Sequence, residues 1–168
     1  MAALITEVLG ILNEQAERYG ELVGLSEEKR EAIVSNDVDA LQKINQLEGM
    51  LVNQCNRLEK KRLQLTLDVA TVLNQRAETL TLTRLIDLME GQEEQEALID
   101  VQYRIKNTMN ELNELNHQNG LLIQNALEYI EFSTNMIRAQ MGQGESSFPG
   151  MDEDDRPGSG FGFINKQN

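Results

Sequence analysis

The residue types that most often carry enzyme and metal chemistry are scarce in this chain. The sequence holds one histidine, His117, and one cysteine, Cys55. A zinc site takes about four ligands, mostly of these two types. His117 also lacks a Ser, Cys or Asp partner placed by a strand-to-helix turn, so we expect it to lie exposed and neutral on a helix. We predict no catalytic residue, no metal and no cofactor.

Two other features of the chain suggest chemistry only at first sight. Residues 158–162, Gly-Ser-Gly-Phe-Gly, are as glycine-rich as a phosphate-binding loop, but such a loop needs a strand before it and a helix after it. Cys55 falls on the apolar seam of a predicted helix, where a cysteine acts as a small buried hydrophobic residue. A lone cysteine allows no internal disulfide and is typical of a reducing compartment.

The charge balance narrows the range of partners. Fifteen Lys and Arg against 28 Asp and Glu give a net charge of −13 and an isoelectric point near 4.5. Phosphate backbones and anionic membranes require clustered cations, so we expect no nucleic-acid partner. Residues 1–12 lack the basic region of a secretory signal, and no uncharged apolar stretch reaches the roughly 20 residues of a membrane helix. We expect a soluble, cytoplasmic protein without membrane insertion.

One basic cluster interrupts this acidic background. Arg57, Lys60, Lys61 and Arg62 stand close together, with Glu59 among them. A solvated helix face is the favoured interpretation, and docking of an acidic partner is the alternative.

Apolar residues at spacings of three and four predict three long helices and one short helix. The first covers about residues 3–34. The second begins after a cap at Asn36 or Asp37 and continues as heptads from Leu41 to Val72, interrupted by Glu48 and Arg62. Residues 74–83 form a connector, in which Thr81 or Thr83 caps a short helix that ends near Gly91. The last helix covers about residues 92–141.

These elements predict an all-α fold, an elongated antiparallel bundle of three long helices plus one short helix. The composition changes after residue 141, where residues 142–168 hold both prolines and half of the glycines. Such a segment buries too little apolar surface to offset its chain entropy. We therefore expect a helical bundle over residues 1–141 and a disordered, acidic and glycine-rich C-terminal tail over residues 142–168.

Asparagine recurs at every third position of the last helix. The five residues are Asn107, Asn110, Asn113, Asn116 and Asn119. Asparagine is a mediocre helix former, and a spacing of three drifts slowly around a helix. The resulting ribbon of amides could hydrogen-bond the backbone of a partner peptide, or it could be a solvated surface that arose by chance.

Beyond this ribbon the last helix carries more apolar residues than one bundle contact requires. Leu122, Ala126, Tyr129, Ile130, Ser133 and Ile137 form a broad face, Ile123 and Leu127 extend it, and Leu121 and Phe132 lie together on another side. A bundle contact uses a stripe about 100° wide. The surplus indicates a groove for a client helix or an interface with a second chain, and bundle core is the third alternative.

The tail contains three of the four phenylalanines, Phe148, Phe161 and Phe163. Disordered segments are usually depleted in aromatic residues. We interpret these residues as short docking elements or as a plug for the apolar face of the bundle itself.

Three stretches of the sequence, in order, resemble the FlgN family of flagellar export chaperones for hook-associated proteins. The first is Leu25–Leu41, with Glu-Glu-Lys-Arg-Glu-Ala-Ile-Val followed by Ser-Asn-Asp-Val-Asp-Ala-Leu. The second is Glu111–Leu122, Glu-Leu-Asn-Glu-Leu-Asn-His-Gln-Asn-Gly-Leu-Leu. The third is Ala126–Phe132, Ala-Leu-Glu-Tyr-Ile-Glu-Phe. The resemblance covers roughly residues 1–141.

The resemblance implies a cytoplasmic, non-enzymatic chaperone. It would bind the C-terminal segments of the hook-associated, or filament-junction, proteins, prevent their premature assembly and deliver them to the export gate and ATPase components of the flagellar type III apparatus. The family binds clients through its C-terminal helical region. That role carries over to Asn116, Asn119, Leu121, Leu122, Ile123, Ala126, Leu127, Tyr129, Ile130, Phe132 and Ile137.

In some members of the family a tail aromatic residue beside glycine, often tyrosine, docks at the gate. Here that role would fall to Phe148, Phe161 or Phe163. The competing hypothesis is a structural coiled-coil or scaffold protein that forms a homodimer or a larger homo-oligomer through its apolar last helix. Polar seam residues and irregular heptads argue against a long regular rod.

Overall fold

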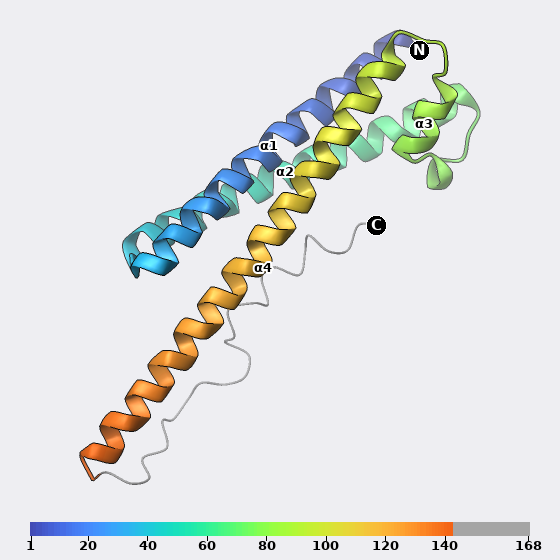
Figure 1. Ribbon diagram of the computed structural model, residues 1–168. Helices are drawn as coiled ribbons and strands as arrows, with labels where there is room; N and C mark the ends of the chain where they lie inside the picture. The colour runs from blue at the N-terminus through green and yellow to red at the C-terminus, as the bar shows by residue number, and fades with distance from the viewer. Residues whose placement is uncertain (143–168) are drawn as a thin grey trace. The chain divides into compact units, whose positions relative to one another are not determined.

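The computed structural model describes residues 1–142, which form four α-helices and one short 3₁₀ helix. Figure 1 shows α1 (Ala2–Ser35), α2 (Val38–Leu73), α3 (Leu82–Leu88) and α4 (Glu94–Gln140), with the 3₁₀ turn η1 at Ala77–Thr79. No strand occurs in this part of the chain. The prediction of three long helices and one short one is confirmed. The predicted tail lies, apart from Gly142, outside the described residues.

The turn between α1 and α2 uses the Ser-Asn-Asp sequence in two different ways. Asn36 closes α1 in the left-handed conformation, with φ 60°, and its backbone N–H is directed to the carbonyls of Ala32 and Ile33. Asparagine tolerates this conformation better than most residues. Asp37 caps α2, because its carboxylate accepts a hydrogen bond of 3.1 Å from the backbone N–H of Ala40. Of the two predicted caps, Asp37 is therefore the correct one.

The connector from α2 to α4 follows the same local chemistry. Asn74 ends α2 with φ 55°. The hydroxyl of Thr81, not that of Thr83, caps α3 by accepting a hydrogen bond of 3.1 Å from the backbone N–H of Arg84. Gly91, with φ 81°, provides the left-handed turn between α3 and α4.

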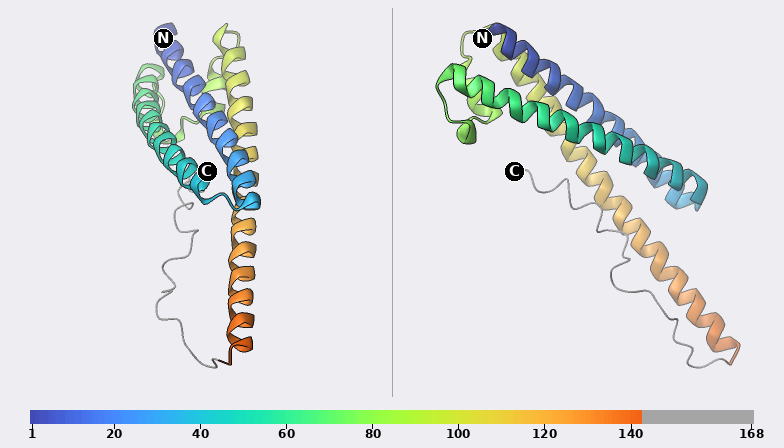
Figure 2. Two further views of the ribbon diagram at one scale, coloured as in Figure 1. Left: turned by 90° about the vertical axis from the view of Figure 1, so that its left-hand side faces the viewer. Right: turned by 180° about the vertical axis from the view of Figure 1, so that it is seen from behind.

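The described residues divide into two units, residues 1–119 and residues 120–142. In the first unit α1, α2 and the first part of α4 lie side by side, and α2 runs antiparallel to both of the others (Figures 1 and 2). The short helix α3 lies at the end of this unit that carries the N-terminus. This arrangement is the predicted antiparallel bundle.

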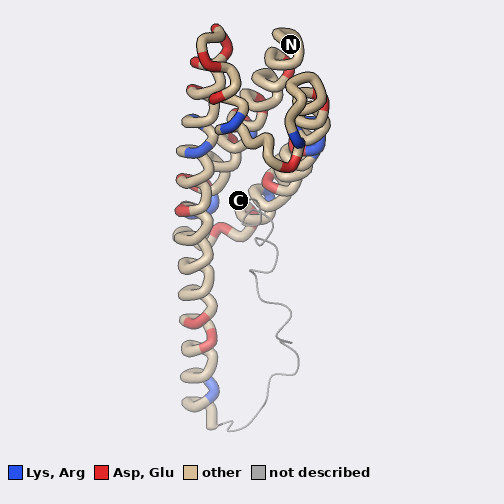
Figure 3. The backbone as a smooth tube through the Cα atoms, turned by 90° about the vertical axis from the view of Figure 1, so that its right-hand side faces the viewer, with Lys and Arg blue, Asp and Glu red and all other residues tan. Residues whose placement is uncertain are grey.

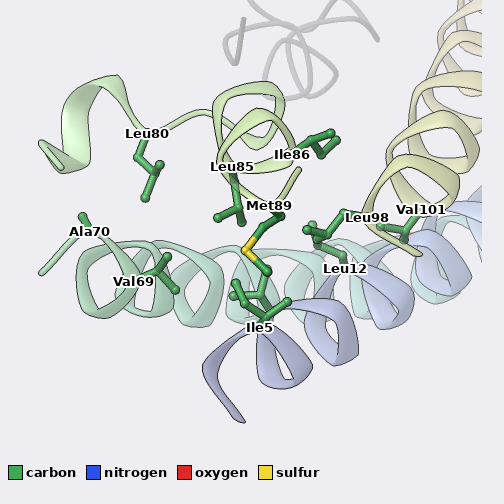
Figure 4. Close-up of a cluster of buried hydrophobic side chains, with 11 residues drawn as sticks. Ile5, Leu12, Val69, Ala70, Leu80, Leu85, Ile86, Met89, Leu98 and Val101 are labelled. Carbon is green, nitrogen blue, oxygen red and sulfur yellow. The ribbon is translucent and has the colours of Figure 1, made fainter. Parts of the chain in front are cut away.

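Two separate clusters of buried side chains form the core of the first unit. Figure 4 shows the larger one, in which all three long helices and the connector meet and Met89 extends towards Ile5. Its buried members are Ile5, Val8, Leu12, Val69, Ala70, Leu80, Leu85, Ile86, Met89, Leu98 and Val101. The smaller cluster contains Leu22, Val23, Cys55, Leu112 and Leu115.

The predicted apolar seam of α2 differs from the buried one at its end. Val72, which we expected in the seam, is 55% exposed. Val69, also expected in the seam, is buried, and Ala70 is buried in place of Val72. In a straight α-helix, equivalent heptad positions rotate around the helix axis by roughly 20° per heptad. Over a long helix, the residues of a strict heptad pattern therefore turn away from the buried side unless the helix supercoils.

Candidate functional site

The two polar residues that interrupt the α2 seam each take part in an ion pair. Arg62 donates from Nε to the Glu59 carboxylate at 2.9 Å, and a second guanidinium nitrogen binds the other carboxylate oxygen. Gln15 of α1 donates its side-chain amide to the same carboxylate at 3.0 Å. Burial opposes ionisation of Glu59, but the hydrogen bonds and positive charge outweigh it and hold its pKa below the usual value. The pair therefore links α1 to α2 in its ionised form.

A cavity of about 200 Å³ lies beside this pair. Most of its lining is apolar, and its polar side chains are Gln15, Tyr19, Glu59, Arg62, Thr66 and Thr81. Burial raises the pKa of Tyr19 to about 12, so its hydroxyl stays protonated at neutral pH. The Glu59 carboxylate is paired with the Arg62 guanidinium, and the Tyr19 phenol is neutral. These groups connect helices and do not form an acid–base pair, because their pKa values are shifted away from neutral pH.

The second interruption, Glu48, accepts a hydrogen bond of 3.2 Å from the ammonium group of Lys29 on α1. Lys29 is 5% exposed. A buried ammonium requires a partner, because an unpaired charge away from water is costly. Glu48 interrupts the apolar seam of α2 because it provides the counter-charge for the buried Lys29.

The asparagine ribbon does not share one environment. Asn107, Asn110 and Asn113 are exposed, whereas Asn119 is only 3% exposed. The Asn119 amide donates to the backbone carbonyl of Ser26 at 2.8 Å, while its own carbonyl oxygen has no partner. Asn116 is half-buried and accepts a hydrogen bond of 3.3 Å from the Ser26 hydroxyl. The last two asparagines therefore attach α4 to α1.

The lone cysteine and histidine lie apart from these polar groups. Cys55 is buried in the smaller cluster, as predicted, and burial raises its pKa to about 11. Its thiol is therefore protonated at neutral pH and a poor nucleophile. His117 is exposed on α4. Over residues 1–142 the side chains of His, Cys, Asp and Glu do not gather in any set of three or more that could hold a metal.

The second unit, from Gly120, exposes the residues that the sequence analysis selected for partner binding. None of residues 120–142 is buried. Ile130 is 58% exposed and Tyr129 is 72% exposed, while Leu122 and Ile123 are half-buried. The remaining selected residues of this unit, Leu121, Ala126, Leu127, Phe132 and Ile137, are also exposed.

The arrangement of these residues around α4 follows from helix geometry. At about 100° per residue, most of the apolar residues after Gly120 fall within roughly one half of the circumference. We call this half the apolar surface of α4; it contains Leu122, Ile123, Ala126, Leu127, Tyr129, Ile130, Met136 and Ile137. The charged residues Glu128, Glu131 and Arg138 fall on the other half. The surface is twice as wide as one ordinary helix contact.

Some selected residues lie away from this surface. Leu121 and Phe132 fall among the polar residues of the opposite half. Met136, which the site prediction did not include, is 47% exposed on the apolar surface. Asn116 and Asn119 belong to the first unit. Phe148, Phe161 and Phe163 lie outside the described residues.

The fold and this exposed helix half define an all-α protein with an apolar surface of the kind that binds a partner helix. Comparison with protein-family models matches residues 1–147 to the FlgN protein family. The chain therefore belongs to the FlgN family, a family of flagellar export chaperones. Comparison with curated proteins and with solved structures gave no significant match. Among the described residues, no helix is both long and apolar enough to span a membrane.

Proposed function

We propose that this protein binds the C-terminal segments of flagellar hook-associated proteins, prevents their premature assembly and delivers them to the flagellar type III export apparatus. The site of action would be the cytoplasm, and the role would be non-enzymatic. Family membership supports the chaperone role in general. The observation that carries the specific role is the exposed apolar surface of α4, which a chain of charge −13 keeps in solution without a partner.

Binding on this surface would follow the helix-in-groove mode. A client segment that is unfolded alone would form a helix and place its apolar side chains against α4. The client loses conformational entropy in this step, so part of the gross interaction energy is spent on ordering. Affinity then remains moderate for the area buried, and the client can be released at the export apparatus.

We assign the client contacts to the residues from Leu121 onward. Asn116 and Asn119 already hydrogen-bond Ser26 in the first unit. Their proposed contribution to client binding is therefore indirect, by holding α4 in place. For the aromatic residues Phe148, Phe161 and Phe163 we propose docking at the export gate. A chain that ends at Gly142 would then keep its client affinity and lose its affinity for the gate.

Titration calorimetry with synthetic C-terminal segments of hook-associated proteins from the same genome tests the proposal. Binding at micromolar affinity or tighter, with a negative change in heat capacity, is expected because apolar area is buried. Absence of heat with every segment at several temperatures would contradict it.

The apolar surface also fits a second copy of the chain, which is the scaffold alternative. Light scattering after size-exclusion chromatography separates the two functions. A stable dimer that remains dimeric in the presence of client segments would favour the scaffold. A chaperone would form a complex that contains the client segment.

A further inference from the structure

Over residues 40–67 the outer face of α2 carries cations without acids, and the exposed carboxylates Asp39 and Asp68 stand just beyond the two ends of this stretch. Between Ala40 and Leu67 the helix contains two carboxylates, Glu48 and Glu59, and both are turned inward, with side chains 13% and 18% exposed. The exposed charges of this stretch are all positive: Lys43, Arg57, Lys60 and Lys61. In Figure 3 all Lys and Arg positions of the described chain are blue and all Asp and Glu positions are red. A solvated helix face in a protein of charge −13 would be expected to carry acids as well.

Several exposed cations of the described residues, those of this face among them, belong to no ion pair. In the described part of the chain, Arg18 pairs with Glu21, Lys29 with Glu48 and Arg62 with Glu59. Arg57, Lys60 and Lys61 form no ion pair with any of the described residues. Three neighbouring cations therefore repel one another, and one exposed carboxylate, that of Asp68, falls on the same stripe of the helix seven residues after Lys61.

Two exposed leucines lie next to these cations. Leu63 is 51% exposed and Leu67 is 50% exposed. Lys60, Leu63 and Leu67 follow the spacing of one helix face, and Arg57 and Lys61 fall on the adjoining stripe. The five residues form a single patch, which we call the basic face of α2. It combines positive charge with apolar area on a rigid helix.

We propose that the basic face of α2 is a docking site for an acidic amphipathic helix of a partner protein. Carboxylates of that helix would pair with Arg57, Lys60 and Lys61, while its apolar side chains would cover Leu63 and Leu67. Charge complementarity favours this partner. Because this protein is acidic as a whole, an acidic segment is attracted to it only where cations cluster, as they do on the basic face of α2. Nucleic acids and anionic membranes fit this site less well. Their negative charge extends over a large area and would be repelled by the net charge of −13 on the whole molecule.

The basic face of α2 and the apolar surface of α4 have no residue in common, so the inference does not rest on the proposed function. The probe is a synthetic fluorescent helix with glutamates and leucines at helical spacing, and the same peptide with lysines in place of the glutamates is the peptide control. Binding of each to the full chain is measured by anisotropy at low and at raised salt. Amide chemical shifts of the isotope-labelled chain map the contact.

The test variant is R57E/K60E/K61E, and the matched control is R30E/R104E/K106E, which reverses three other exposed cations. The expected results are shift changes centred on Arg57–Leu67, an affinity that falls as salt rises, and a loss of about 10-fold or more in the test variant alone. Client binding on α4 stays unchanged in both variants.

Four results would overturn the inference. These are absence of binding, equal loss in both variants, shift changes away from α2, and tighter binding to phosphatidylglycerol vesicles or to a single-stranded oligonucleotide than to the acidic peptide. Equal loss would mean that net charge alone governs the interaction.

Discussion

At the scale of single residues, the buried polar side chains of this protein determine how its helices pair. Asn119 is buried on α4, and its side-chain amide donates a hydrogen bond to the backbone carbonyl of Ser26 on α1. A buried amide that bonds across two helices stabilises only one register of the pair. The unpartnered carbonyl oxygen of Asn119 offsets part of that gain.

Asn119→Ala should therefore lower the free energy of unfolding by about 1–2 kcal/mol, because the amide that bonds Ser26 is removed from a buried position. Asn113→Ala is the matched control on the same ribbon. Asn113 is exposed, and alanine is the better helix former, so its stability should change by less than about 0.5 kcal/mol. Urea unfolding followed by circular dichroism measures both. Equal effects of the two substitutions would contradict the assignment.

Local chemistry was predictable from the sequence at this scale, and long-range partners were not. The local sequence narrowed each cap to two residues, of which the structure uses Asp37 and Thr81. The burial of Cys55 followed from its place in the apolar pattern of α2. The interruptions at Glu48 and Arg62 were visible in the pattern of α2. The partner of Glu48 is Lys29 on another helix, and such a partner depends on the tertiary register, which helical periodicity does not specify.

At the scale of the elements, the central part of α2, residues 40–67, separates its charges by sign. Its two central carboxylates face the bundle and its exposed cations face outward. Glu59 is the best placed of these groups, because it is bound at once by Arg62 of its own helix and Gln15 of α1. Glu59 thus forms an ion pair within α2 and accepts a hydrogen bond that links α2 to α1.

The depressed pKa of Glu59 predicts a specific dependence of stability on pH. A carboxyl whose folded pKa lies below its ordinary value of 4.5 adds stability that is full above that value and is lost as pH falls through the folded pKa. Glu59→Gln should lower the free energy of unfolding by about 1–3 kcal/mol at pH 7, because the half-buried Arg62 loses its counter-charge.

Urea unfolding of both proteins at neutral pH and well below pH 4.5 measures this effect. The difference between the wild type and Glu59→Gln should shrink on acidification, whereas other carboxyls titrate equally in both. A difference that stays constant or grows at low pH would contradict the role given to Glu59.

The helices themselves were the most predictable elements. Apolar spacing and the scarcity of proline before residue 145 gave their number, order and approximate bounds. The end of the α2 seam was mistaken at Val72, because the choice between Val72 and Ala70 depends on the path of the neighbouring helix.

At the scale of the whole molecule, burial and exposure are divided between the two units. Both apolar core clusters belong to residues 1–119, while the second unit leaves its apolar residues accessible. The surplus of apolar residues after Gly120 was evident from the sequence. Its use as bundle core was one alternative, and the exposure of Tyr129 and Ile130 favours partner binding instead.

The central claim is that clients bind the apolar surface of α4. The most direct test compares I130D/I137D with Q124D/N135D, which adds the same charge on the opposite half of the helix. Client affinity is measured by titration calorimetry, and circular dichroism verifies helicity. Each isoleucine is more than half exposed, so the variants should fold.

We expect client affinity to fall about 100-fold or more in I130D/I137D, because apolar burial is lost and two carboxylates are desolvated. The Q124D/N135D variant should bind like the wild type. Unchanged client binding by a folded I130D/I137D chain would contradict the account.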